Sequence, residues 1–219
     1  MTPEAYAHLR RVDPVLAALI RRAGPCTLRV ERRQSPYEAL VRSIAFQQLN
    51  GKAAETILGR FHALYPDACT PPPQQLLETP DEVLRGVGFS RNKILALKDI
   101  AARTLEGTVP ERRVVARLSD EAIIERLTQV RGVGRWTAEM LLMTLLGRPD
   151  VLPLGDFGVR NGFRLAYRKR SMPTPRALAR HGERWAPYRT TAAWYLWRAV
   201  DLAREGRLPE AAGGVRPRD

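Results

Sequence analysis

A short turn with two glycines, Gly132 and Gly134 in VRGVGRWTAEM, lies between two stretches of helical pattern. Glycines at such a turn permit left-handed backbone and the close approach of another backbone. The next helix is expected to begin near Arg135, so its free amides and the positive end of its dipole point out of the turn. The turn therefore predicts a phosphate-binding site, although many helix pairs use glycine turns for packing alone.

The overall charge supports that prediction. The 219 residues include 36 Lys and Arg against 23 Asp and Glu, a net charge of +13. Such an excess binds polyanions through counterion release, whatever their sequence. Because most of the cations are Arg, whose planar fork can hold a phosphate with two nitrogens, nucleic acid is the favoured partner. A solvated basic surface and another acidic partner are the alternatives.

A second candidate for chemistry is Asp156, in LPLGDFGVR, ahead of a helix expected over 159–168. A fixed carboxylate shielded from water can stabilise a positive charge that develops beside it during a reaction. The ordinary interpretation of a lone Asp before a helix is an N-cap. Taken by itself, the residue favours the cap.

Several classes of protein are excluded by composition. Cys26 and Cys69 are the only cysteines and have no CxxC spacing, so a disulfide framework, an iron–sulfur cluster and a zinc ribbon are ruled out. No apolar run approaches the roughly 20 residues of a membrane span. The N-terminus, MTPEAYAHLRRVDP, is too charged for a secretory signal. We expect a cytoplasmic protein without a membrane partner.

Helical periodicity dominates the chain and predicts an all-α fold. Ser35 and Pro36 begin one helix as N-cap and first residue, with an apolar stripe at Leu40, Ile44 and Phe46. The Pro- and Gly-rich stretch 147–158 suits a crossing between two lobes. Further helices are expected over 51–64, 74–78, 80–85, 90–106, 119–129, 159–168, 174–181 and 188–204.

Four stretches together resemble one family. LTQVRGVGRWTAEMLLM is similar to the hairpin of helix-hairpin-helix (HhH-GPD) DNA glycosylases, and GVGRWTA is closest to the AlkA-like 3-methyladenine DNA glycosylase II branch. YEALVRSIAFQQLNGKAA, GFSRNKILALKDIA and LPLGDFGVRNGF resemble three further segments of that family. The longer AlkA-like proteins carry an N-terminal β domain. Only about 35 residues precede the first matched helix here, so the resemblance is to a compact form.

The resemblance implies a role for each matching residue. Asp156 corresponds to the catalytic carboxylate. Trp136 stands where strand-cleaving relatives carry a Lys that forms a Schiff base, so no lyase activity is expected. The base pocket would be lined by Trp136, Trp185, Phe46 and Met140, where Met140 replaces a family Tyr. Aromatic faces attract alkylated purines because those bases are cationic.

The DNA contacts follow from the same resemblance. Gln48 and Leu49 would insert into the duplex and fill the gap left by a flipped base. The phosphate-binding hairpin would comprise Arg131, Gly132, Val133, Gly134 and Arg135. A monovalent cation, Na⁺ or K⁺, is implied at the backbone of Gln129, Arg131 and Gly134. No other cofactor is required.

The expected architecture is a two-lobed helical bundle with a DNA-binding cleft between the lobes. One lobe spans 36–147 and holds the helix-hairpin-helix motif. The second comprises 1–35 plus 148–210 and carries Asp156, and 211–219 form a flexible tail. Trp194 and Trp197 are expected in the core of the protein.

The implied function is that of a monomeric, nucleoid-associated, monofunctional DNA glycosylase in base excision repair. It would flip alkylated purines of the 3-methyladenine and 7-methylguanine type out of double-stranded DNA and hydrolyse their N-glycosidic bond. Two alternatives stay open: a glycosylase of the same fold for mismatched or oxidised bases, and a non-catalytic helix-hairpin-helix DNA-binding module.

Overall fold

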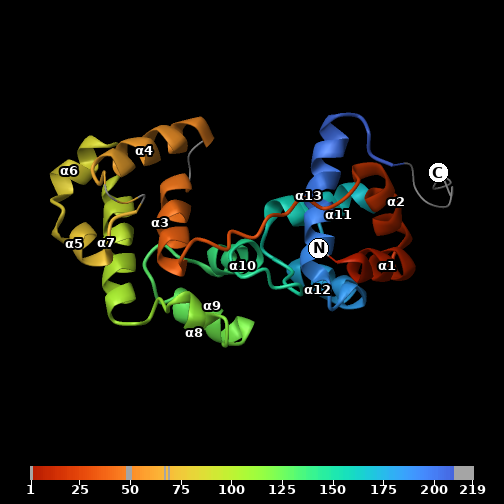
Figure 1. The fold of residues 1–219 in the computed structure, drawn as a ribbon. Helices are drawn as coiled ribbons and strands as arrows, with labels where there is room; N and C mark the ends of the chain where they lie inside the picture. The colour runs from red at the N-terminus through yellow and green to blue at the C-terminus, as the bar shows by residue number, and fades with distance from the viewer. Residues whose placement is uncertain (1, 48–50, 67, 69, 210–219) are drawn as a thin grey trace. The chain divides into compact units, whose positions relative to one another are not determined.

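The computed structural model describes residues 2–47, 51–66, 68 and 70–209 (Figure 1). This part of the chain is all helical, with thirteen α-helices, one 3₁₀ turn and no strand, so the predicted all-α fold is confirmed. None of these helices has the length and apolarity that crossing a membrane requires. The expected flexible tail, 211–219, lies outside the described residues.

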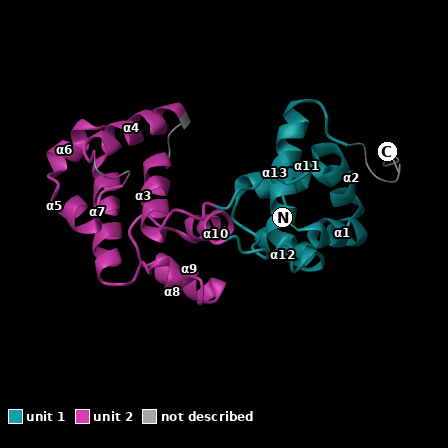
Figure 2. Cartoon of the chain, in the orientation of Figure 1, with its two compact units in different colours: residues 1–30, 147–219 teal, residues 31–146 magenta. Residues whose placement is uncertain are grey.

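The chain divides into two compact units (Figure 2). Unit 1 comprises residues 1–30 and 147–219, and unit 2 comprises residues 31–146. The lobes expected from the sequence had boundaries at 35/36 and 147/148. The second differs by one residue from the boundary of the compact units, and the first by five. Glu31 donates its amide to the Thr144 carbonyl at 2.8 Å, which ties residue 31 to the last helix of unit 2.

Unit 2 is built around a central helix, α7 (Arg91–Leu105). The helix α3 (Pro36–Phe46) packs on α7, and the core that the helices of this unit share includes Leu40, Ile44, Leu97 and Ile100. The helices of unit 2 are α3 (Pro36–Phe46), α4 (Gly51–Ala63), α5 (Pro73–Glu78), α6 (Asp81–Gly86), α7 (Arg91–Leu105), α8 (Arg112–Val115), α9 (Asp120–Leu127) and α10 (Arg135–Thr144).

Unit 1 is centred on the crossing of two helices, α11 (Phe157–Ala166) and α13 (Arg189–Arg204). Its helices are α1 (Pro3–Val12), α2 (Pro14–Ala23), α11 (Phe157–Ala166), α12 (Pro175–Gly182), the 3₁₀ turn η1 (Glu183–Trp185) and α13 (Arg189–Arg204). The helix α2 packs on α13, and α1 packs on α2 and η1. The sequence patterns did not predict α1 and α2, which contribute the buried Leu9, Leu16 and Leu19 to this core.

Local capping explains where several helices begin. Ser35 forms a capping box with Glu38, in which the Ser35 amide donates to Glu38 Oε2 at 2.6 Å and the Glu38 amide donates to Ser35 Oγ at 3.2 Å. The predicted start of α3 is thus confirmed. Ser90, Ser119 and Thr174 cap α7, α9 and α12 in the same way, by accepting an amide of the first turn.

Candidate active site

Asp156 is the N-cap of α11. Its Oδ1 accepts the amide of Val159 at 2.6 Å, which places the carboxylate over the first turn of the helix. The same oxygen accepts the indole Nε1–H of Trp197, on α13, at 2.8 Å. The residue is 9% exposed, so its carboxylate is largely shielded from water. The two sequence interpretations of Asp156, cap and candidate catalytic group, therefore describe one geometry.

Two glycines of α11 allow that geometry. A Cβ at Gly162 would overlap the carbonyl oxygen of Leu196, so the backbones of α11 and α13 cross at a distance that only glycine permits. A Cβ at Gly158 would lie 2.8 Å from Trp197 Cδ1 and 3.1 Å from Asp156 Oδ1. Because the glycines are four residues apart, they face α13 together, and Gly158 leaves room for the Asp156–Trp197 hydrogen bond.

The hairpin turn lies between α9 and α10 in unit 2. Gly132 has φ +78°, in the left-handed region, and a Cβ there would lie 3.2 Å from both Ala96 Cβ and Ile44 Cδ1. Gly134 is the N-cap of α10, and a Cβ there would meet no atom within 4 Å. Val133 is buried at 4% exposure and anchors the turn. Gly132 is thus required by the protein's own packing, whereas the space at Gly134 is open to a ligand.

Two polar contacts fix the turn to the rest of unit 2. The amide of Arg131 donates to Asp99 Oδ2, on α7, at 2.7 Å. The side-chain amide of Gln47 donates to the Gly132 carbonyl at 3.0 Å. Gln47 directly precedes Gln48 and Leu49, the predicted intercalating residues, which lie outside the described residues. The segment leading to those residues is therefore bonded to the hairpin turn itself.

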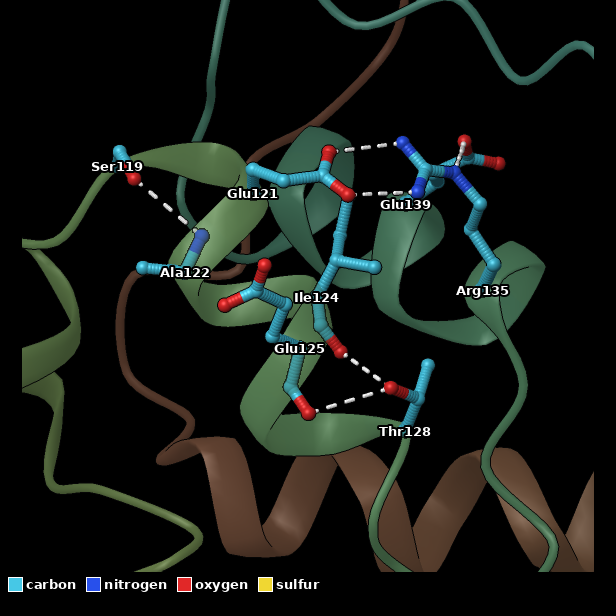
Figure 3. Close-up of polar contacts among 8 residues, drawn as sticks. All are labelled: Ser119, Glu121, Ala122, Ile124, Glu125, Thr128, Arg135 and Glu139. Carbon is cyan, nitrogen blue, oxygen red and sulfur yellow. Dashed lines mark hydrogen bonds and ion pairs between the residues drawn. The ribbon is translucent and has the colours of Figure 1, made fainter.

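Arg135, predicted among the phosphate-binding residues, has its guanidinium engaged by two carboxylates (Figure 3). It forms a two-pronged ion pair with Glu121 on α9, at 2.8 and 2.9 Å, and its Nε lies 3.2 Å from Glu139 Oε1. The hydrogen bonds from Arg135 lower the pKa of Glu121, and the same bonds raise the pKa of Arg135. The side chain thus joins the two hairpin helices, and what position 135 offers a phosphate is the start of the helix.

Three of the predicted pocket residues lie in unit 2. Trp136, in the first turn of α10, is 46% exposed although its ring is large and apolar. Met140 follows one turn later on the same helix and is half-buried. Phe46, at the end of α3, is half-buried, and Arg42 Cζ lies 4.6 Å from its ring centroid. Nearly half of the surface of Trp136 is therefore accessible to solvent.

The comparisons with known proteins agree with these features. A family model described as HhH-GPD superfamily base excision DNA repair protein matches residues 41–187, a range that includes the hairpin and Asp156. The chain belongs to the HhH-GPD superfamily. The resemblance inferred from the four sequence stretches is thereby confirmed.

Individual HhH-GPD relatives match over nearly their whole lengths. DNA-3-methyladenine glycosylase 1 of Schizosaccharomyces pombe is 42% identical over 91% of this chain and 88% of its own. The structure of the 3-methyladenine DNA glycosylase of that organism in complex with abasic DNA has a TM-score of 0.83 and 41% identity, covering 91% of this chain and 98% of that chain. A DNA-3-methyladenine glycosidase from Bacillus halodurans has a TM-score of 0.83 and 35% identity, covering 93% and 92% of the two chains. The expected compact form is confirmed.

The fourth predicted pocket residue of this HhH-GPD protein, Trp185, is part of the packing of unit 1. It is 0% exposed, and its Nε1–H donates to Asp13 Oδ2 at 2.9 Å. The rings of Phe163 and His181 lie at centroid distances of 6.4 and 5.2 Å. In this structure Trp185 is therefore a residue of the buried core of unit 1.

Asp13 is the centre of this buried cluster. Its Oδ1 caps α2, while its Oδ2 accepts bonds from Trp185, Tyr167 and His181. Burial alone would raise the pKa of Asp13, but the hydrogen bonds from His181, Tyr167 and Trp185 outweigh it and lower the pKa to about 2. Because Tyr167 follows the last turn of α11, the cluster fixes the far end of the helix that Asp156 caps.

The residue that sequence reasoning missed is Trp197. It was expected in the core with Trp194, and it instead lies half-buried beside Asp156. The two residues are 41 positions apart, and Trp197 falls after the matched family range. No local pattern in the sequence signals this pairing. The spacing of Gly158 and Gly162 signals only that another helix comes close.

Proposed function

We propose that this protein excises alkylated purines from double-stranded DNA as a monofunctional glycosylase that hydrolyses the N-glycosidic bond in base excision repair. The observation that carries the proposal is the Asp156 carboxylate, oriented by Val159 and Trp197 in a chain that matches 3-methyladenine glycosylases along most of its length. On this proposal the protein acts as a monomer, is associated with the nucleoid, and has alkylated DNA as its substrate.

The proposed mechanism uses the carboxylate electrostatically. Departure of the base leaves positive charge on the deoxyribose, and a fixed, shielded carboxylate stabilises that oxocarbenium-like state. The two donors to Asp156 Oδ1 hold the group in place before the substrate arrives, so little reorganisation is needed during bond cleavage. The carboxylate also orients the attacking water.

Substrate preference is assigned to unit 2. The exposed face of Trp136 attracts a cationic methylated base more strongly than a neutral one. Methylated purines are already good leaving groups, which limits the catalysis that the protein must supply. Met140 and Phe46 complete the proposed pocket. Gln48 and Leu49 form the proposed wedge, which fills the gap left by the flipped base. Trp136 has no nucleophilic amine, so strand cleavage is not expected.

The hairpin turn is proposed to bind a DNA phosphate with the amides at the start of α10, which no side chain caps. Carbonyl oxygens suit a monovalent cation, and those of Gln129 and Arg131 are the proposed ligands. The carbonyl of Gly134, the third residue implied at the cation site, accepts the Ala138 amide at 3.1 Å as the first hydrogen bond of α10. Affinity for DNA should fall when Na⁺ or K⁺ is replaced by a bulky organic cation at equal ionic strength.

The deciding experiment measures free base released from duplexes that carry single defined lesions. We expect release of 3-methyladenine and 7-methylguanine, with no strand nick until the abasic product is treated with alkali. Release of an oxidised or mismatched base in preference to both would replace the proposed substrate. DNA binding without release of any base would reduce the protein to a binding module.

A further inference from the structure

The net charge of the protein lies almost entirely in one of its two units. Unit 1 contains 20 Lys and Arg against 9 Asp and Glu, a net charge of +11. Unit 2, which holds the hairpin, contains 16 against 14, a net charge of +2. A nearly neutral unit contributes little to the long-range attraction of a polyanion. We therefore expect the hairpin to position the duplex, and most of the electrostatic attraction to come from unit 1.

Within unit 1, one stretch has many cations and no anion. Between Phe157 and Gly182 the sequence has no Asp or Glu. Two of its arginines bond to their own chain: Arg160 Nε donates to the Pro173 carbonyl at 3.0 Å, and Arg164 donates to Asn161 Oδ1. The others are exposed, and we call them the α11–α12 basic segment: Arg168, Lys169, Arg170, Arg176 and Arg180.

The basic segment presents its charges without internal neutralisation. No ion pair among the described residues involves any of its five cations, whereas Arg189, Arg198 and Arg207 of the same unit are each paired with an acid. Arg168 has φ +51°, which turns the chain away from the end of α11. Arg176 and Arg180 are four residues apart on α12 and so share a face of that helix.

The distance from Asp156 fits a contact along one DNA strand. The ten residues of α11 separate Asp156 from the basic segment and span roughly 15 Å at 1.5 Å per residue. Phosphates of one strand advance about 3.4 Å per nucleotide along the duplex axis. The basic segment is therefore within reach of phosphates about four nucleotides from a nucleotide held at Asp156.

We propose that the α11–α12 basic segment is a second DNA-binding surface, which holds the phosphate backbone to one side of the target nucleotide and supplies most of the salt-dependent affinity. The proposal rests on DNA as the substrate of the proposed function. It divides the work between the units: the hairpin and wedge position the duplex, and the basic segment retains it.

The test compares three double variants for binding to undamaged and abasic duplexes across a range of salt concentrations. Two remove charge from the basic segment, Lys169→Gln/Arg170→Gln and Arg176→Gln/Arg180→Gln. The matched control, Arg21→Gln/Arg204→Gln, removes two exposed charges of the same unit, on α2 and at the end of α13. Arg168 is left intact because its backbone conformation would complicate a substitution.

Each lost phosphate contact lowers the slope of log K against log salt by about 0.9. We expect each basic-segment variant to lose about 1.8 in slope and tens of fold in affinity near 0.1 M salt, and the control to lose about two-fold at most. Neutral methylphosphonate linkages about four nucleotides from the abasic site should lower the affinity of the wild-type protein for the duplex. The same linkages should leave the affinity of the basic-segment variants unchanged. Equal losses in all three variants, or none, would overturn the proposal.

The excision rate separates this proposal from the proposed function. With enzyme in saturating excess over methylated DNA, the basic-segment variants should release base at the wild-type rate, because they leave Asp156 and the hairpin intact. If the variants lose salt-dependent binding as expected but the wild type releases no base, the proposed function is excluded and the DNA-binding role of the basic segment stands. Normal release with unchanged salt slopes in the variants would remove the basic segment alone.

Discussion

The indole nitrogen of Trp197 and the amide of Val159 donate to the same oxygen of Asp156, at 2.8 and 2.6 Å. One donor comes from the helix that Asp156 caps, and the other comes from the helix packed across it. The carboxylate is therefore oriented by the crossing of α11 and α13, and its position depends on how closely those two helices pack.

Trp197→Phe tests this orientation. The ring is retained and the N–H donor is lost, so the carboxylate has one fewer restraint. We expect the single-turnover excision rate to fall about ten-fold while affinity for abasic DNA stays the same, because a hydrogen bond to a charged group is worth about 1.5 to 3 kcal/mol. Trp194→Phe, on the same helix, is the control. A parallel loss in both variants would mean that Trp197 acts only through stability.

Asp156→Asn tests the carboxylate itself. The amide oxygen of Asn can still accept the Val159 bond, so the start of α11 should survive. Loss of the negative charge removes stabilisation of the oxocarbenium-like state, and we expect base release to fall at least about a hundred-fold. Gel-shift affinity for undamaged duplex should match the wild type. Turnover near the wild-type rate would exclude Asp156 from the chemistry.

Substitutions of the α11 glycines separate stability from activity. Gly162→Ala forces a Cβ into the Leu196 backbone and should lower the free energy of unfolding by about 3 kcal/mol or prevent folding. Gly158→Ala meets the side chain of Trp197 and should displace it, with loss of excision at a smaller cost in stability. Gly155→Ala, where an added Cβ meets nothing within 4 Å, should change neither. Denaturant unfolding and base release measure the two effects.

Two arginines of the hairpin should respond differently to removal of charge. The guanidinium of Arg135 is paired with Glu121 and Glu139, so Arg135→Gln should leave the salt slope of DNA binding unchanged. It should lower the free energy of unfolding only slightly, because the pair with Glu121 is exposed to solvent. Arg131 is exposed, and only its backbone amide is bonded to Asp99. Arg131→Gln should lower the slope by about 0.9 if its side chain contacts a phosphate. The reverse pattern would reassign the phosphate contact to Arg135.

The buried Asp13 should make stability depend on pH. Its pKa is about 2 in the folded protein against 3.8 as its ordinary value, so its ionised form favours folding above pH 3.8. That contribution, about 2 kcal/mol, is lost as the pH falls through 2. We therefore expect the difference in free energy of unfolding between the wild type and Asp13→Asn to decrease as the pH is lowered from 5 to 2. A difference that does not vary with pH would show that Asp13 acts only as a neutral acceptor.

Much of the local structure could be predicted from the sequence, because it depends on residues within a turn of one another. The capping box of Ser35 and Glu38 set the start of α3, and the glycines at 132 and 134 marked the hairpin. The chemistry-bearing Asp156 was recognisable in its motif. Its position as N-cap moved the start of the helix to Phe157, two residues before the predicted one.

The tertiary structure decided which side chains meet across long separations in the chain. It brought Trp197 to Asp156, buried Trp185 against Asp13, and paired Arg135 with Glu121. None of these pairings has a periodicity or a spacing rule, because each depends on how two helices cross once their apolar faces are packed. The sequence by itself determined the helices, the hairpin and the carboxylate, and the packing of α11 on α13 determined how that carboxylate is held.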